Sequence, residues 1–105
     1  MTKIDPKKVY MLTKKIPRGK VTTYGEIAKV LGGIKYSRAV GKILNKNFDR
    51  HVPCHRVVCF NGKVGGFRKG IQRKIKILKK EGIKIRNGKV LNFDKVLFKF
   101  SKKVK

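Results

Sequence analysis

The residues best suited to chemistry lie in one short run, Pro53-Cys54-His55-Arg56-Val57. A thiol beside an imidazole and a guanidinium is a candidate nucleophile, because cationic or proton-accepting neighbours stabilise the thiolate. Adjacent side chains usually diverge, so a bridging water is the easier proton route between Cys54 and His55. A carboxylate would then orient the imidazole, as in other nucleophile–base–orienter triads. Among five acidic residues, Glu81 ends a predicted helix and could reach back toward the core.

The same region allows three other interpretations. A zinc site could be built from His51, Cys54, His55 and Cys59, although this spacing is cramped and fits no familiar zinc finger. Cys54 and Cys59 could instead form a disulfide, or Cys54 could be an inert packing residue. The N-terminus carries no signal peptide, so we expect a reducing compartment, in which two cysteines are more often free than bridged.

The charge of the chain predicts a polyanionic partner. Lys and Arg number 30 against 5 Asp and Glu, a net charge of +25 over 105 residues. Nucleic acid is the expected partner ahead of an anionic membrane, although high growth temperature or an AT-rich genome also enriches lysine. No apolar run reaches the about 18 residues of a membrane span. We expect one domain over residues 1–105, monomeric, and cytoplasmic or nucleoid-associated.

Apolar spacing predicts four helices, which begin near residues 6, 24, 37 and 71. Asp5 before a proline and Thr23 in a capping box mark the first two starts. Two glycines separate the second helix from the third, which runs to about Leu44, so this pair is a helix-turn-helix candidate. The fourth helix carries Lys and Arg over nearly all of its outer face.

Two Asn-Gly pairs predict β-hairpins, at residues 57–64 and 83–91. The basic tail at 98–105 is expected to fray in part. Together these elements predict a mostly α domain with short β-hairpins, a winged-helix-like helix-turn-helix fold.

An ordered set of motifs carries a resemblance to a known family. They are Ile16-Pro17-Arg18-Gly19-Lys20-Val21-Thr22-Thr23-Tyr24-Gly25-Glu26-Ile27-Ala28, Ser37-Arg38-Ala39-Val40-Gly41, Asn47, Pro53-Cys54-His55-Arg56-Val57-Val58, Val64-Gly65-Gly66-Phe67 and Glu81-Gly82. From about Lys8 to Ile85 the chain resembles the active-site domain of O6-alkylguanine-DNA alkyltransferases, also called methylated-DNA–protein-cysteine methyltransferases. The resemblance implies that the protein binds double-stranded DNA, flips an O6-alkylguanine into a pocket and transfers the alkyl group irreversibly to its own cysteine. It implies no metal and no cofactor.

The resemblance implies roles for four catalytic residues. Cys54 would be the alkyl acceptor, His55 would act through a water as its base, and Glu81 would orient His55. Tyr24 would protonate N3 of the leaving guanine and crowd the phosphate that rotates during flipping.

Other positions would serve DNA and substrate binding. Arg38 would fill the gap left by the flipped base. The small residues Ala39 and Gly41 would let the third helix lie close in the minor groove. Asn47 would be the hinge between the helix-turn-helix and the active-site loop. The backbone of Cys54 and Val57 would accept from the guanine amino group.

The chain departs from the family pattern in three places. The pocket lid reads Phe67, Arg68 and Lys69, where the family usually has Tyr-Ser-Gly. The loop at 48–52 is polar and shorter than the usual apolar stretch. Few residues precede the match, so the N-terminal family domain is expected to be absent.

Two other functions compete with the enzyme. Alkyltransferase-like proteins share this domain, replace the cysteine, usually by tryptophan, and flag lesions without repairing them. A general basic chromatin-type protein would not need the ordered motifs. The presence of Cys54 favours the alkyl-transferring enzyme.

Overall fold

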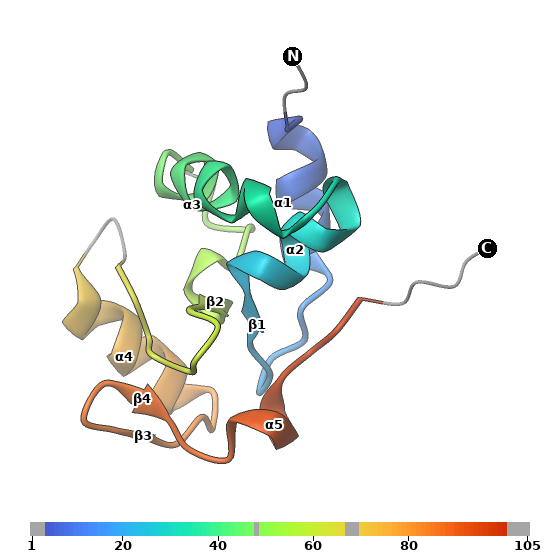
Figure 1. Ribbon diagram of the computed structural model, residues 1–105. Helices are drawn as coiled ribbons and strands as arrows, with labels where there is room; N and C mark the ends of the chain where they lie inside the picture. The colour runs from blue at the N-terminus through green and yellow to red at the C-terminus, as the bar shows by residue number, and fades with distance from the viewer. Residues whose placement is uncertain (1–3, 48, 67–69, 101–105) are drawn as a thin grey trace.

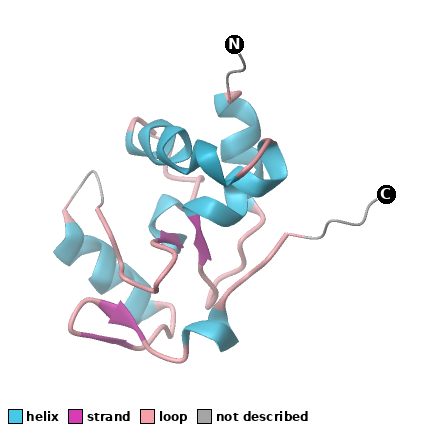
Figure 2. Cartoon of the chain, in the orientation of Figure 1, coloured by secondary structure: helices cyan, strands magenta, loops and turns pink. Residues whose placement is uncertain are grey.

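The computed structural model describes residues 4–47, 49–66 and 70–100 (Figure 1). Its α-helices are α1 (Pro6–Lys14), α2 (Tyr24–Leu31), α3 (Ser37–Asn45), α4 (Ile71–Lys80) and α5 (Phe93–Val96). Two 3₁₀ turns are η1 (Ile34–Tyr36) and η2 (Cys54–Arg56). The strands are β1 (Thr22–Thr23), β2 (Val57–Val58), β3 (Ile85–Arg86) and β4 (Lys89–Val90). The mostly α class with short strands, seen in Figure 2, is as predicted.

Helices α1, α2 and α3 enclose the first of two cores. Their apolar faces bury Val9, Ile27, Val40 and Leu44, and each such side chain contributes about 1.5–3 kcal/mol relative to exposure. The predicted N-caps are confirmed. Oδ1 of Asp5 accepts from the backbone N of Lys7 at 2.9 Å, and Oγ1 of Thr23 accepts from that of Glu26 at 3.0 Å.

The turn between α2 and α3 depends on Gly32. Its φ is +151°, and a Cβ there would lie 2.9 Å from the Tyr36 ring, so only glycine fits. The chain then passes through η1, which the sequence did not predict, directly into α3. This arrangement confirms the helix-turn-helix.

The strand β2 was predicted as one side of a hairpin, and this prediction was wrong. β2 instead pairs in parallel with β1, with Thr22 opposite Val57 and Thr23 opposite Val58. Only a turn remains of the predicted hairpin, in which the backbone N of Gly62 donates to the Cys59 carbonyl at 2.9 Å. Two consecutive fully buried valines are typical of a strand covered on both faces, as parallel strands usually are.

The second core lies between α4 and the β3–β4 hairpin. It buries Val21, Val58, Val64, Leu78, Ile83 and Val90. Val57 packs in the first core and Val58 in the second, because successive side chains of a strand point to opposite faces. The strand that follows the reactive run therefore joins the two cores. The hairpin predicted at 83–91 is confirmed as the antiparallel pair β3–β4.

The start of the predicted frayed tail is in fact packed. The backbone N of Phe98 donates to the Val21 carbonyl at 2.6 Å, and Oγ1 of Thr22 donates to the Phe98 carbonyl at 2.7 Å. The Phe98 and Phe100 rings meet edge to face at 5.2 Å. None of the described helices has the length and apolar character needed to cross a membrane.

A matched pair of glycine substitutions tests the loop before α4. Gly65 has a φ of +78°, and a Cβ there would lie 3.0 Å from Sγ of Cys59, whereas a Cβ on Gly66 meets nothing within 4 Å. Gly65→Ala should therefore lower the free energy of unfolding by about 1–2 kcal/mol through left-handed backbone strain. Gly66→Ala should change it by less than about 0.5 kcal/mol. Urea unfolding followed by circular dichroism measures both, and equal effects would contradict the assigned backbone conformation.

Candidate active site

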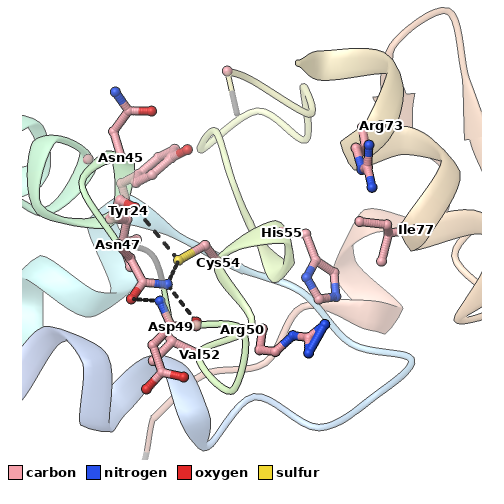
Figure 3. A pocket seen from close by; sticks show the side chains of 13 residues that line it. Tyr24, Asn45, Asn47, Asp49, Arg50, Val52, Cys54, His55, Arg73 and Ile77 are labelled. Carbon is pink, nitrogen blue, oxygen red and sulfur yellow. Dashed lines mark hydrogen bonds between the residues drawn. The ribbon is translucent and has the colours of Figure 1, made fainter. Parts of the chain in front are cut away.

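A pocket of about 310 Å³ lies between the end of α3, η2 and α4 (Figure 3). This volume is near the lower end of the about 300–1,000 Å³ typical of small-molecule sites. The pocket brings together five of the predicted site residues: Tyr24, Gly41, Asn47, Cys54 and His55. They come from segments far apart in the sequence, so the fold assembles a site around the thiol.

Asn47 links the end of α3 to the thiol. Its Nδ2 donates to Sγ of Cys54 at 3.1 Å and to the Asp49 carbonyl at 2.9 Å. Its Oδ1 accepts from the backbone N of Asp49 at 3.1 Å. One side chain thus holds both the loop and the sulfur, which is the geometry that a hinge residue needs.

The Cys54 thiol is half-buried, and burial raises its pKa above the ordinary value. The Asn47 hydrogen bond and the nearby Lys74 charge lower the pKa but do not cancel the burial. The thiol therefore stays protonated in the free protein, contrary to the simple expectation that cationic neighbours stabilise the thiolate. A nucleophilic role for this thiol would therefore require a base.

His55 is held by a carboxylate, and Glu81 is that carboxylate. Nε2 of His55 lies 2.9 Å from Oε2 of Glu81, whose side chain is only 7% exposed. Burial lowers the pKa of His55 against the opposing pull of Glu81, so the imidazole is neutral near pH 7. An ionised carboxylate only accepts hydrogen bonds, so Nε2 carries the proton and Nδ1 is left as the basic nitrogen.

Arg56 is a part of the site that the sequence reasoning missed. Its Nε and Nη2 donate to the two oxygens of Glu81 at 2.9 and 2.8 Å, and its Nη1 donates to the Ile16 carbonyl at 2.8 Å. Burial raises the pKa of Glu81, but the hydrogen bonds from Arg56 and His55 outweigh it and hold the pKa below its ordinary value. The sequence held a signal for Arg56: this long cationic side chain stands directly before two valines that form a buried strand.

Lys74 was also missed, because α4 was predicted to expose its basic residues. Lys74 is fully buried. Its Nζ donates to the carbonyls of Val57 and Gly66, at 2.7 and 3.2 Å. Burial lowers its pKa to about 8. Lys74 lies four residues before the buried Leu78, so both side chains lie on the same inward face of α4.

Tyr24 begins α2 and lines the pocket. Burial, followed by the nearby thiols, raises its pKa to about 12, so the hydroxyl keeps its proton and can donate a hydrogen bond. Nζ of Lys74 lies 5.9 Å from the centre of the Tyr24 ring. The Tyr24 ring also packs next to Gly41, where a Cβ would lie 3.8 Å from it.

The remaining predicted residues divide into three groups. Arg38 lines an open groove along α3, which shares Tyr24 and Gly41 with the pocket. Ala39 is half-buried on α3 and lines neither hollow, and Val57 is fully buried with its carbonyl bound by Lys74. The lid residues Phe67, Arg68 and Lys69 lie outside the described residues.

The described residues support neither the zinc site nor the Cys54–Cys59 disulfide that the sequence left open. Within residues 4–47, 49–66 and 70–100, no group of three or more His, Cys, Asp or Glu side chains is arranged to hold a metal ion. Cys54 and Cys59 are both free thiols.

The sequence of the chain matches a family profile over residues 6–83. The profile is described as the DNA-binding domain of 6-O-methylguanine DNA methyltransferase. The chain belongs to this family. The match covers every residue that lines the pocket, and it ends before the β3–β4 hairpin of the second core. It agrees with the family inferred from the ordered motifs.

Individual relatives agree with this membership. The methylated-DNA–protein-cysteine methyltransferase of Methanosarcina acetivorans is 49% identical over 77 residues, 72% of this chain and 49% of that protein. A bifunctional methyltransferase/endonuclease of Picrophilus torridus is 43% identical over 83 residues, 78% of this chain and 28% of that protein. The chain thus spans about half, or less, of the length of these curated relatives.

One solved structure covers nearly the whole of both chains. S. pombe Atl1, in complex with damaged DNA containing O6-carboxymethylguanine, is similar with a TM-score of 0.79 and 37% identity. The similarity covers 90% of this chain and 94% of Atl1. It confirms the helix-turn-helix fold.

Replacing Glu81 by glutamine should lower stability in a pH-dependent way. The folded state holds the Glu81 pKa below 4.5, so its contribution is present above that value and is lost as the pH falls through the folded pKa. Glu81→Gln should therefore unfold more easily at neutral pH, and the difference should shrink as the pH falls below 4.5 and through the lowered folded-state pKa. Urea unfolding across this range measures it. Asp94→Asn removes an exposed carboxylate and is the control; a Glu81→Gln difference that did not change with pH would contradict the assigned ionisation.

Proposed function

We propose that this protein transfers the alkyl group of an O6-alkylguanine in double-stranded DNA to Sγ of Cys54, once per molecule. The observation that carries the proposal is a half-buried thiol that shares a pocket of about 310 Å³ with an imidazole held by a carboxylate. Because a thioether is stable, the alkylated protein would not be regenerated.

The first step is removal of the proton from the Cys54 thiol. Nδ1 of His55, the free basic nitrogen, takes the Cys54 proton through a water, and Glu81 stabilises the imidazolium that forms. The resulting thiolate attacks the alkyl carbon, the S–C bond forms and the C–O6 bond breaks. The bonding electron pair leaves with the guanine oxygen. Glu81 can do this because Arg56 keeps it ionised.

Tyr24 would stabilise the leaving group. The departing guanine would carry a negative charge, which a hydrogen bond from Tyr24 to N3 disperses until guanine takes up, through water, the proton that His55 received. The Tyr24 side chain lines the pocket, and its hydroxyl remains protonated because its pKa is about 12. It therefore acts as a hydrogen-bond donor throughout the physiological pH range.

Access to the pocket is proposed to run along α3. The groove lined by Arg38 and Lys42 joins the pocket at Tyr24 and Gly41. A helix that carries small and basic residues there fits a minor groove, where contacts to phosphates ignore sequence. Arg38 would then occupy the space of the flipped base. Binding through phosphate contacts should weaken steeply as salt rises.

A lesion-binding protein without transfer is the second candidate. The observation in its favour is the match to S. pombe Atl1, which extends over 94% of that chain and is bound to damaged DNA. The same pocket would then hold the base without chemistry. The thiol of Cys54 and its link to Asn47 favour the enzyme.

Intact-protein mass spectrometry separates the two functions. Incubation with a duplex that carries O6-methylguanine should add one CH₂ to the protein, located on the peptide with Cys54. Cys54→Ser should gain no mass and still bind the duplex, because serine is a far weaker nucleophile of similar size. A parent protein that binds the lesion without gaining mass would reject transfer. Loss of binding in Cys54→Ser would mean that the cysteine is structural.

Arg38→Ala should slow repair in duplex DNA by about tenfold or more, equivalent to ~1.4 kcal/mol of barrier. The reaction with free O6-benzylguanine should change little, since no base needs to be flipped. Rates of alkyl transfer to Cys54 from both substrates measure this. Arg86→Ala removes the same charge from the β3–β4 hairpin and is the control. Equal losses on both substrates would reject the role of Arg38 in flipping.

A further inference from the structure

Two arginines at the rim of the pocket have no task in the transfer reaction. Arg50, in the loop before Cys54, and Arg73, in the first turn of α4, both line the pocket and are both exposed to solvent. A side chain that lines a cavity and is also exposed lies at its mouth. In Figure 3 the two guanidinium groups lie on either side of the His55 imidazole in the view.

No Asp or Glu side chain in the described part of the chain forms an ion pair with either arginine. All five carboxylates of the Asp and Glu side chains lie in the described residues, and their ion pairs engage Lys29, His51, His55 and Arg56. Asp49 lines the same pocket, but its Oδ1 accepts from the backbone N and the Nδ1 of His51 at 2.9 and 3.1 Å. Arg56, by contrast, donates hydrogen bonds to the carboxylate of Glu81 and the carbonyl of Ile16. The site thus has one structural arginine and two that remain available to a ligand.

The backbone at both arginines is held in place. Asn47 bonds the loop just before Arg50, the backbone N of Val52 donates to the Asp49 carbonyl at 3.1 Å, and Val52 is buried. Arg73 sits on a helix, with its backbone N bonded to the Gly70 carbonyl at 3.1 Å. Fixed backbones reduce the entropy that a charged side chain loses on binding.

The ligand expected at this mouth is a pair of phosphates. When a base rotates into a pocket, the sugar-phosphate chain on both sides of it stays at the entrance and carries one negative charge per linkage. Guanidinium groups bind phosphate through two parallel N–H donors. We propose that Arg50 and Arg73 bind the two phosphates that flank the flipped nucleotide, one from the loop and one from α4. The inference rests on the proposed function only in placing a flipped nucleotide in the pocket.

Neutral linkages in the DNA test this directly. Binding is measured in the Cys54→Ser background, with duplexes that carry O6-methylguanine and one methylphosphonate on its 5′ or 3′ side. In this background each neutral linkage should weaken binding. Arg50→Ala and Arg73→Ala should each weaken binding to the all-phosphate duplex by about tenfold, the size of one charge-assisted contact. Each should also abolish the response to one of the two linkages.

The control is Arg86→Ala, which removes the same charge from an exposed strand remote from the pocket and should keep both responses. Arg50→Gln and Arg73→Gln repeat the test with longer neutral side chains that keep the surface polar. If Arg50→Ala and Arg73→Ala respond to both linkages as the background does, the proposal is overturned. It is equally overturned if the background shows no response.

A second measurement separates phosphate binding from effects on the pocket. With Cys54 intact, Arg50→Ala and Arg73→Ala should react with free O6-benzylguanine at the parent rate, because the free base carries no phosphate. A parallel loss on the free base would reject the assignment. The binding measurement does not need alkyl transfer, so a protein that binds lesions without repairing them would still show the phosphate contacts.

Discussion

The contact between Arg56 and Glu81 holds the two halves of this protein around the Cys54 thiol. The guanidinium donates to both carboxylate oxygens of Glu81. It also donates to the carbonyl of Ile16, which lies just after α1. Glu81 caps α4, so one arginine joins the helical half, the turn η2 and the second core. Removing one partner of such a buried pair typically costs about 3–5 kcal/mol, because the other charge is left buried and uncompensated. The imidazole of His55 depends on the same carboxylate, so stability and reactivity share one interaction.

The electrostatics around the thiol follow from burial more than from the positive charge of the chain. A net charge of +25 surrounds a thiol whose pKa is nevertheless raised and an imidazole whose pKa is lowered. Water outside screens the exposed lysines, whereas desolvation acts directly on groups inside the pocket. The free protein therefore stores a neutral thiol beside a neutral base. In the transfer reaction proposed above, such a pair would become reactive only when a substrate arrives, which would protect the thiol from other electrophiles.

Local patterns predicted the elements that depend on neighbours in the chain. The N-caps at Asp5 and Thr23, the helix-turn-helix and the Asn-Gly hairpin at β3–β4 all follow from short-range geometry. The pairing of β2 was not predicted, because a strand two residues long is stabilised by whichever distant partner buries it. The buried Lys74 was missed for the same reason: its two acceptors, Val57 and Gly66, lie on other segments.

The sequence by itself determined the family, and it placed the candidate nucleophile Cys54 among its neighbours, since the ordered motifs keep their residue types and spacing in the linear chain. It also indicated Glu81 as the partner of His55, because few carboxylates compete. Only the tertiary structure decided the protonation states of Cys54 and His55 and the contacts that Arg56 and Lys74 make around them. The burial of a group depends on segments that meet only after folding. The contacts of Arg56 and Lys74 depend on such segments in the same way. The same is true of Arg50 and Arg73, two surface arginines in the sequence, which the fold brings to one pocket mouth.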